Sequence, residues 1–341
     1  MGTIRELISK VVERIDLEEE EMERAMSEVM EGSASPSQIA AFLVGLRMKG
    51  ETVSEITGAA RLMRRKCTKI VPRDEATVDL CGTGGDNQGT FNISTVASLI
   101  AAGAGVSVAK HGNRGVSSGV GSADVLAELG VNIDLLPENA EKCLNEVGIN
   151  FLYAPNYHPA MKSVSGPRRD LGIRTIFNVL GPIANPAGVT HQVMGVFSEV
   201  LLEPIARVLR NLGSLRCMVV HGSDGMDEIT VTGKTYVAEL RDGMVKTYQL
   251  DPADYGFKRR TLKELRGGTA KVNSEIVLSI LKGEEKDAKR EISVLNAAAA
   301  IYVAGMTGDM KSAIEMAEES IDLKRALYKL NDLIKFSAGF N

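Results

Sequence analysis

Residues 78–124 read VDLCGTGGDNQGTFNISTVASLIAAGAGVSVAKHGNRGVSSGVGSAD, and this stretch decides the fold. The apolar, β-branched run at 77–81 is typical of a buried strand. A glycine loop follows at 82–89, and Asn92 or Ser94 can cap the apolar helix that comes next. Strand, loop and helix in this order predict the first half of a parallel α/β arrangement.

A second unit of the same kind follows directly. Its strand, 106–109, runs into the polar loop 110–115, and Ser122 then caps a helix that stops at Gly130. Because ligands bind at the carboxyl ends of the strands in an open α/β sheet, both polar loops are expected at one binding edge. Backbone amides and helix N-termini at that edge attract anions.

The glycine loop differs from the commoner glycine-rich motifs. Position 87 is Asn, so the sequence fails G-x-G-x-x-G, and the absence of a following Gly-Lys-Ser/Thr excludes a P-loop. A glycine pair alone is most often a flexible turn. Here a hydroxyl-rich helix start follows at 92–95, and the cations Lys110 and Arg114 come one unit later. This combination predicts an anion site for phosphate or pyrophosphate.

The composition bounds the class of protein. The chain has 341 residues, of which 44% are hydrophobic and 25% charged, as in an ordinary globular enzyme of one or two domains. A net charge of −4 argues against a nucleic-acid partner. The N-terminal residues are charged where a signal peptide needs an apolar run, and no segment is long enough to span a membrane.

The cysteines indicate a reducing compartment. They are widely separated and form no C-x-x-C pair, so we expect reduced thiols, no zinc site and a cytoplasmic location. The four residues are Cys67, Cys81, Cys143 and Cys217.

Helices are expected on both sides of the α/β stretch. Apolar residues keep helical spacing throughout 4–66, and 71–74 has the composition of a linker. A hairpin is expected at 235–250, around an Asp-Gly turn. Further helices are expected at 274–282 and 295–305.

Asp227 and Glu228 form an acidic pair just beyond a predicted strand at 218–220. An isolated pair of this kind can equally be a solvated surface turn. Its place after a strand favours a Mg²⁺ site, because Mg²⁺ takes one or two carboxylates together with substrate phosphates and water. The histidines lack helical metal-ligand spacing, which argues against zinc. They are His111, His158, His191 and His221.

These motifs resemble the anthranilate phosphoribosyltransferase family, of the nucleoside phosphorylase and phosphoribosyltransferase superfamily. The ordered segments GTGGD, NIST, KHGNR and SSGVGSAD carry the resemblance, with HPAM at 158–161, GIRTIFNVLGP at 172–182 and His221-Gly222 ahead of the acidic pair. The resemblance spans nearly the whole chain. Pyrimidine nucleoside phosphorylases are similar in fold and share a looser glycine loop, so they are the nearest alternative.

The resemblance implies an α/β fold with a small all-helical N-terminal domain and a larger domain around a central mixed, mostly parallel sheet. The helical domain is expected at 1–72, joined by a returning segment at about 165–185. The α/β domain, which would bind phosphoribosyl pyrophosphate, is expected at 73–164 and 186–341. The site would then lie in the cleft between the two domains.

The resemblance also assigns roles to individual residues. Phosphoribosyl pyrophosphate is expected on Gly82, Thr83, Gly84, Gly85, Asp86, Thr90, Asn92, Ser94, Thr95, Lys110 and Ser122. Anthranilate is expected on Gly82, His111, Asn113, His158, Arg168 and Pro182. Two Mg²⁺ ions are expected on Ser94, Asp227 and Glu228. The catalytic residues would be Lys110, His111, Asp227 and Glu228.

The implied reaction joins the amine of anthranilate to C1 of the ribose and releases pyrophosphate, a step of tryptophan biosynthesis. An arylamine needs little deprotonation before attack, so positioning and neutralisation of the leaving group should supply most of the acceleration. His111 is a candidate for taking the amine proton late. An arginine fork suits the substrate carboxylate, and alignment on Leu171-Gly172 favours Arg168 over Arg169.

Two other functions are alternatives to this one. A nucleoside phosphorylase would use inorganic phosphate and need no acidic Mg²⁺ pair, so Asp227 and Glu228 argue against it. A non-catalytic relative would have lost motif residues and gained basic surface, whereas the motifs are intact and the pI is about 5.8.

The expected partners are the two small substrates and a second copy of the chain, with no nucleic acid and no membrane. The resemblance implies a homodimer formed through the helical domain. A methionine stripe fits such an interface and a domain core equally well. It consists of Met22, Met26 and Met30.

Overall fold

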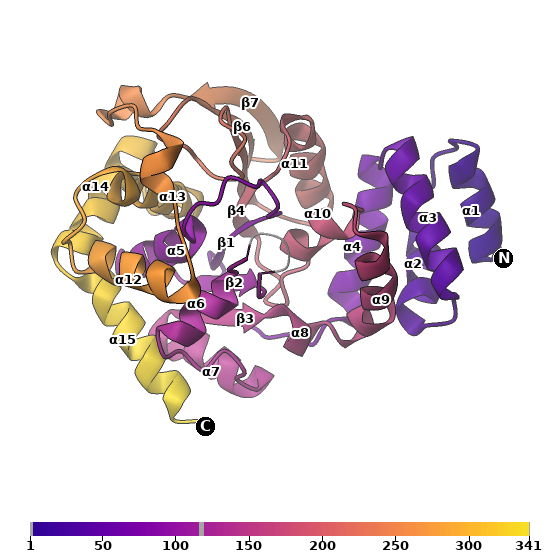
Figure 1. The fold of residues 1–341 in the computed structure, drawn as a ribbon, viewed down its shortest axis with the longest axis horizontal. Helices are drawn as coiled ribbons and strands as arrows, with labels where there is room; N and C mark the ends of the chain where they lie inside the picture. The colour runs from indigo at the N-terminus through magenta and orange to yellow at the C-terminus, as the bar shows by residue number, and fades with distance from the viewer. Residues whose placement is uncertain (1–2, 116–118, 341) are drawn as a thin grey trace.

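The computed structural model describes residues 3–115 and 119–340. Positions 117 and 118, which begin the SSGVGSAD motif, lie outside the described residues. Figure 1 shows a helical bundle from the N-terminal part of the chain beside a larger part built around a sheet. No helix in the described ranges is long and apolar enough to cross a membrane.

Helices α1 to α4 form the bundle, as the apolar spacing of 4–66 predicts. Their bounds are α1 Ile4–Val12, α2 Glu19–Glu31, α3 Pro36–Lys49 and α4 Val53–Lys66. Local chemistry sets where α3 and α4 begin, because Ser35 accepts a hydrogen bond from Gln38 N and Thr52 accepts one from Glu55 N. The methionine stripe of α2 is buried and belongs to the core of the bundle.

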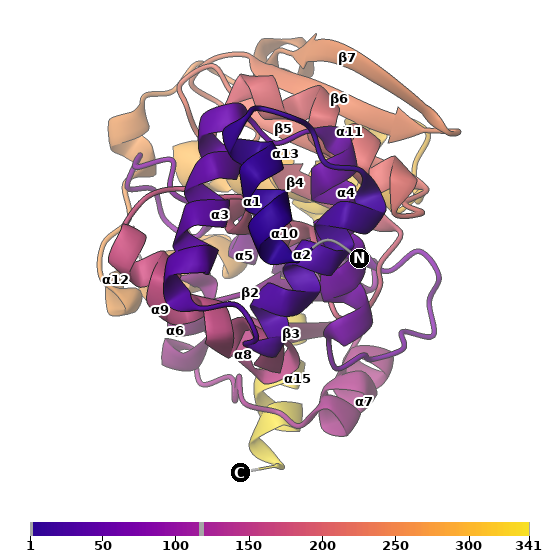
Figure 2. The ribbon, with the colours of Figure 1, turned by 90° about the vertical axis from the view of Figure 1, so that its right-hand side faces the viewer.

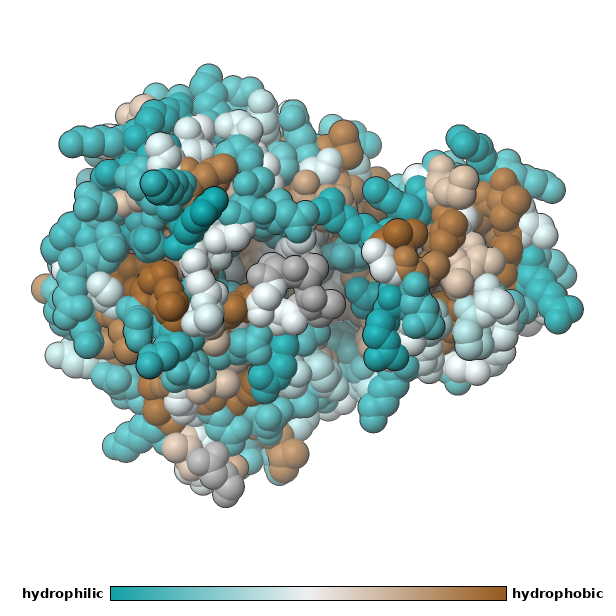
Figure 3. Space-filling view, viewed as in Figure 1, coloured by the Kyte–Doolittle hydropathy of each residue, from teal (hydrophilic) through white to brown (hydrophobic). Residues whose placement is uncertain are grey.

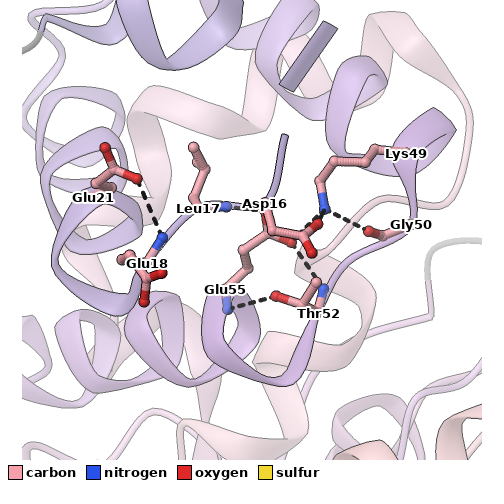
Figure 4. Close-up of polar contacts among 8 residues, drawn as sticks. All are labelled: Asp16, Leu17, Glu18, Glu21, Lys49, Gly50, Thr52 and Glu55. Carbon is pink, nitrogen blue, oxygen red and sulfur yellow. Dashed lines mark hydrogen bonds and ion pairs between the residues drawn. The ribbon is translucent and has the colours of Figure 1, made fainter. Parts of the chain in front are cut away.

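Glu55 is a fully buried carboxylate that ties the bundle together (Figure 4). Its two oxygens accept hydrogen bonds from Leu17 N at 3.0 Å, Thr52 N at 2.8 Å and Lys49 Nζ at 3.0 Å. Lys49 also pairs with Asp16 at 2.6 Å. A buried charge is tolerated only when it is paired and hydrogen-bonded, and both conditions are met here.

The sheet has seven strands within the described residues, in the order β3-β2-β1-β4-β5-β6-β7. Strands β1 to β5 pair in parallel, and β6 and β7 add antiparallel edge pairs. The mixed, mostly parallel sheet is therefore confirmed. The bounds are β1 Val78–Gly82, β2 Val108–Gly112, β3 Ile149–Tyr153, β4 His191–Gly195, β5 Arg216–Gly222, β6 Thr235–Arg241 and β7 Met244–Leu250.

Both faces of the parallel part of the sheet are buried, whereas the edge strand β7 is mostly exposed. On β5, Met218 and Val220 join the core under α5 and α13, whereas Cys217 and Val219 face the opposite core, which includes α11 and the helical bundle. This alternation follows from the two-residue period of a strand. Figure 2 shows the bundle in front of the sheet, with β6 and β7 at the upper edge.

The remaining helices surround the sheet. Their bounds are α5 Ile93–Gly103, α6 Ser122–Glu128, α7 Pro137–Val147, α8 Ala154–Tyr157, α9 Lys162–Leu171, α10 Phe177–Ile183, α11 Leu202–Asn211, α12 Ala270–Leu281, α13 Ala288–Val303, α14 Met310–Asp322 and α15 Arg325–Ala338. Short 3-10 turns occur at η1 Pro159–Met161, η2 Glu199–Leu201, η3 Pro252–Tyr255 and η4 Leu262–Leu265.

Helices α9 and α10 pack on the bundle although they follow β3 in the chain. Val164 of α9 and Leu180 of α10 are buried in the same core as the bundle helices. Helix α9 contacts α2 and α3, and α10 contacts α4. We retain as a proposal the division into a domain of 1–72 with a returning segment and an α/β domain.

Of two local expectations about helix starts, one is confirmed in part and one is wrong. Asn92 occupies the N-cap position of α5, but its side chain makes no capping bond because both of its side-chain groups bind other segments. Ser122 is the first helical residue of α6 and not its cap. Asp124 holds that helix start instead, since it accepts hydrogen bonds from Gly115 N and Gly121 N, both at 2.9 Å.

Candidate active site

The loops after β1, β2 and β5 meet at one edge of the sheet. Strand β1 lies between β2 and β4, and the chain passes from one side of it to the other. Such a reversal of strand order is where open α/β sheets bind ligands. The surface is indented between the α/β part and the helical bundle (Figure 3).

The loop after β1 contains glycine for two different physical reasons. Gly84 and Gly85 have φ of +65° and +73°, a backbone conformation that side chains disfavour. Gly82 is needed because a Cβ there would lie 2.5 Å from Asp227 Oδ2. A Cβ on Gly195, at the end of β4, would lie 1.6 Å from the backbone oxygen of Asp227. The acidic loop thus approaches two strand ends at a distance that only glycine permits.

Asp227 and Glu228 are bound to the two predicted donor segments. Asp227 Oδ2 accepts a hydrogen bond from Gly84 N at 2.7 Å, and Glu228 Oε1 accepts one from Ser94 N at 3.2 Å. Burial raises the pKa of both carboxyls, and the charge of Asp86 raises the pKa of Asp227 further. The negative charge is therefore crowded and incompletely compensated.

Lys110 is buried beside this pair. Its Nζ donates to Leu80 O at 2.5 Å and to Ser94 Oγ at 3.1 Å. Burial lowers its pKa, while the nearby charges of Asp79 and Glu228 act in the opposite direction. The structure thus brings together Lys110, Ser94 and Glu228, which come from three separate segments.

His111 and His158 form a buried pair of neutral imidazoles. Their ring centroids are 5.2 Å apart. Burial lowers the pKa of His111 to about 3 and that of His158 to about 4. In both rings Nε2 is buried and lacks a hydrogen-bond partner among the described residues. Two buried polar atoms are thus left without a partner in the described part of the chain.

Arg168 lies in a partly buried position on α9. Its Cζ is 5.2 Å from the centroid of the Phe177 ring, and burial lowers the pKa of its guanidinium. Among the described residues no carboxylate forms an ion pair with it. The neighbouring Arg169 is exposed. Of the two arginines, Arg168 is therefore the one with a desolvated, unpaired charge.

Pro182 contacts the sheet through its carbonyl, which accepts a hydrogen bond from Gln192 Nε2 at 2.8 Å. Thr83 is tied to the end of β4, because its Oγ1 accepts from Phe197 N at 3.0 Å. Thr90 forms an isolated bridge with Arg266.

The other predicted ligand residues differ in exposure and in whether their polar atoms already have hydrogen-bond partners. Asn113 is exposed, and Ser122 is half-buried at the start of α6. Thr95 Oγ1 is buried without a partner in the described part of the chain. Asn92 accepts a hydrogen bond from Asn273 at 2.9 Å and donates one to the carbonyl of Val120 at 3.2 Å, which leaves one N–H and one lone pair of its side chain for a ligand.

Asp79 and Asn273 were missed in the sequence. Asp79 is fully buried in β1 and accepts a hydrogen bond from His111 N at 3.2 Å. Its charge within an otherwise apolar strand was the available signal. Asn273 accepts a hydrogen bond from Gly268 N at 2.7 Å and donates to Asn92. No local pattern marks this contact, because it joins residues far apart in the chain.

The acidic pair fits Mg²⁺ by its chemistry. Hard carboxylate and hydroxyl oxygens from Asp227, Glu228 and Ser94 are the ligand type that Mg²⁺ prefers. Burial first, and then the neighbouring negative charges, raise the pKa of both carboxyls, so a cation here would stabilise their ionised forms. The described residues contain no group of three or more acidic, histidine or cysteine side chains placed to hold a metal. Substrate oxygens would have to complete the shell.

The fold and this site define a glycosyl transferase that combines a helical bundle with an α/β domain. Residues 5–67 match the helical bundle domain of the glycosyl transferase family, and residues 74–327 match its a/b domain. The predicted fold class is confirmed by this match.

The chain belongs to the anthranilate phosphoribosyltransferase family. It is 51% identical to anthranilate phosphoribosyltransferase of Acetivibrio thermocellus over 99% of this chain and 97% of the relative. The enzyme from Thermus thermophilus superposes with a TM-score of 0.93 at 41% identity, covering 97% and 99% of the two chains. The Saccharomyces cerevisiae enzyme in complex with PRPP and Mg gives a TM-score of 0.89 at 27% identity, covering 99% and 98%.

Proposed function

We propose that this protein transfers the 5-phosphoribosyl group from phosphoribosyl pyrophosphate to the amine of anthranilate. The products are N-(5-phosphoribosyl)anthranilate and pyrophosphate, and the reaction belongs to tryptophan biosynthesis. The observation that carries the proposal is the meeting of Gly84, Ser94 and Lys110 with Asp227 and Glu228 at one sheet edge. Anthranilate phosphoribosyltransferases that align with nearly the whole chain support the proposal.

The donor would lie over the glycine loop and the start of α5. Backbone N–H groups at a loop of this kind and at a helix N-terminus bind phosphate oxygens. Lys110 adds a compact positive charge next to Ser94, and Thr95 offers an unpartnered hydroxyl.

Mg²⁺ would be held by Asp227, Glu228 and Ser94, and we propose two ions per site. The yeast relative was solved with Mg bound, which supports the metal. When bound, Mg²⁺ neutralises the charge that develops on the leaving pyrophosphate. The carboxylates supply the oxygens, and Lys110 limits their repulsion.

Anthranilate would lie between the histidine pair and α9. Arg168 would bind its carboxylate, since this guanidinium is partly desolvated and unpaired within the described residues. Gly82, Asn113 and Pro182 complete the proposed acceptor site. The yeast relative was solved in complex with 4-fluoroanthranilate, which supports a binding site for this class of acid.

Neutral imidazoles can accept the proton that the amine loses. The Nε2 atoms of His111 and His158 are both buried and unpartnered in the described structure. At neutral pH neither ring is protonated, because their pKa values lie well below 7. We assign the late proton acceptor to His111, whose backbone N–H is also fixed by Asp79.

A fluorescence assay tests the function directly. Purified protein, phosphoribosyl pyrophosphate and Mg²⁺ should consume anthranilate, followed as loss of its fluorescence. Chelating Mg²⁺ should stop the reaction. Turnover of a pyrimidine nucleoside with inorganic phosphate, in place of anthranilate consumption, would refute the proposal.

We also propose a cytoplasmic homodimer joined through the helical bundle. Exposed apolar side chains support the interface, with Val12 67%, Ile15 46% and Met48 71% exposed (Figure 3 shows brown patches on this lobe). The free cysteines support a reducing compartment. Sedimentation should give a dimer for the wild type and a monomer for Met48→Glu. A monomeric wild type would refute the interface.

A further inference from the structure

Arg174 contacts the glycine loop from outside the predicted site. It lies between α9 and α10, and its Nη2 donates a hydrogen bond to the carbonyl oxygen of Gly85. Its Cζ lies 4.3 Å from the centroid of the Phe197 ring, just beyond β4. None of the described carboxylates forms an ion pair with this guanidinium. Its charge is therefore directed at a backbone carbonyl and an aromatic face.

Three consecutive residues of the loop are each held by a different part of the chain. Thr83 is bound to the segment after β4, through Gly195 O at 3.0 Å and Phe197 N at 3.0 Å. Gly84 is bound to Asp227. The Gly85 carbonyl is bound to Arg174 alone among the described side chains. Arg174 thus provides the third of three separate anchors.

The loop needs such anchors because its backbone is inherently unrestrained. Gly84, Gly85 and Asn87 all have positive φ, at +65°, +73° and +58°. Glycine has the largest conformational freedom to lose when a loop is ordered. In a trans peptide the C=O and the following N–H point in opposite directions. Holding the Gly85 carbonyl therefore also fixes the direction of the Asp86 N–H.

Arginine suits this role better than lysine would. Its planar guanidinium can stack on a ring and donate a hydrogen bond in its own plane at the same time. The Phe197 ring fixes the plane, and the Phe197 backbone is itself bound to Thr83. The contact joins the segment that packs on the helical bundle to the donor loop.

We propose that Arg174 is a positioning residue for the donor, which holds the glycine loop in its binding conformation through the Gly85 carbonyl and the Phe197 ring. The inference rests on the proposed function, since it takes the loop to be the donor site. Its role is to lower the cost of ordering the loop when the pyrophosphate binds.

Kinetics of Arg174→Ala test the role in binding. The alanine variant loses the hydrogen bond that the charged guanidinium donates to the loop. This loss should raise the KM for phosphoribosyl pyrophosphate about 10-fold or more. The KM for anthranilate and the melting temperature should change little. Arg174→Lys should remain close to the alanine variant, because lysine keeps the charge but not the planar donor. Arg169→Ala, which removes an exposed charge from the same part of the chain, is the matched control.

Hydrogen exchange of the substrate-free protein tests the loop contact independently of activity. Amides of 82–91 should exchange faster in Arg174→Ala than in the wild type or in Arg169→Ala. Amides of α13 should be unchanged in all three, which excludes a general loss of folding. This measurement needs neither substrate, so it remains decisive for the contact even if the wild type does not consume anthranilate.

Three results would overturn the proposal. Unchanged exchange at 82–91 would show that Arg174 does not order the loop. Recovery of the donor KM in Arg174→Lys would show that charge alone matters, as for a direct phosphate ligand. A rise confined to the anthranilate KM would place Arg174 with the acceptor. An inactive wild type would instead refute the proposed function.

Discussion

Replacing Arg168 with Ala should separate acceptor binding from donor binding. The guanidinium is partly buried over Phe177, and no described carboxylate neutralises it. It is therefore available for the anthranilate carboxylate. The donor anchors Gly84, Ser94 and Lys110 lie on other elements, namely the loop after β1, the start of α5 and β2, and should be unaffected by the change.

The size of the effect follows from the kind of contact. A hydrogen bond to a charged group contributes about 1.5–3 kcal/mol, which corresponds to a rise of about 10- to 150-fold in the KM for anthranilate. Folding should be little affected, because removing Arg168 leaves no buried carboxylate without a partner in the described structure. The side chain loses only its packing on Phe177.

Steady-state kinetics with each substrate varied in turn measure this effect. The KM for the donor should move much less than the KM for anthranilate. Arg168→Lys should also be impaired, because an ammonium cannot reproduce a two-pronged contact with a carboxylate. Arg169→Ala is the control and should be mild, since Arg169 is exposed. A rise in the donor KM alone, or damage from Arg169→Ala, would refute this placement of the carboxylate.

The remaining predictions concern metal, loop and pH. Asp227→Ala combined with Glu228→Ala should lower kcat by about 10²-fold or more while anthranilate still binds, and wild-type turnover at ordinary Mg²⁺ would contradict the metal assignment. Gly84→Val should weaken donor binding in calorimetry, because φ at this position is +65°, which a β-branched residue disfavours. The melting temperature should change little, because no atom lies within 4 Å of an added Cβ. Unaltered donor affinity would show that the loop is only a connector. Burial lowers the pKa of His158 from 6.5 to about 4. Between these pH values the unfolded chain binds a proton at this residue that the folded chain does not bind. The free energy of unfolding should therefore fall as pH falls from 6.5 to 4. Urea unfolding of His158→Gln should show a shallower decline, and an unchanged slope would argue against a buried neutral ring.

Local sequence was sufficient for the elements and for the composition of the donor site. Apolar runs and helical spacing predicted the strands at 77–81, 106–109 and 218–220 and the N-terminal helices, because these patterns depend on neighbours along the chain. The glycine loop, the hydroxyl-rich start of α5 and the acidic pair could be placed at one edge by the topology of parallel strands. The identity of the family followed from the order of these motifs.

Tertiary structure decided which groups meet and which remain free. Gly195 must be glycine because the backbone of Asp227 passes against it, and nothing in the sequence near position 195 records that approach. Asn92 accepts a hydrogen bond from Asn273, 181 residues away, and the sequence near position 92 does not predict this contact. Arg174 reaches Gly85 across 89 residues, and Arg168 differs from Arg169 only in which side of α9 it occupies. Such contacts depend on how separate segments pack, whereas helix and strand formation depends on residues within a few positions of each other.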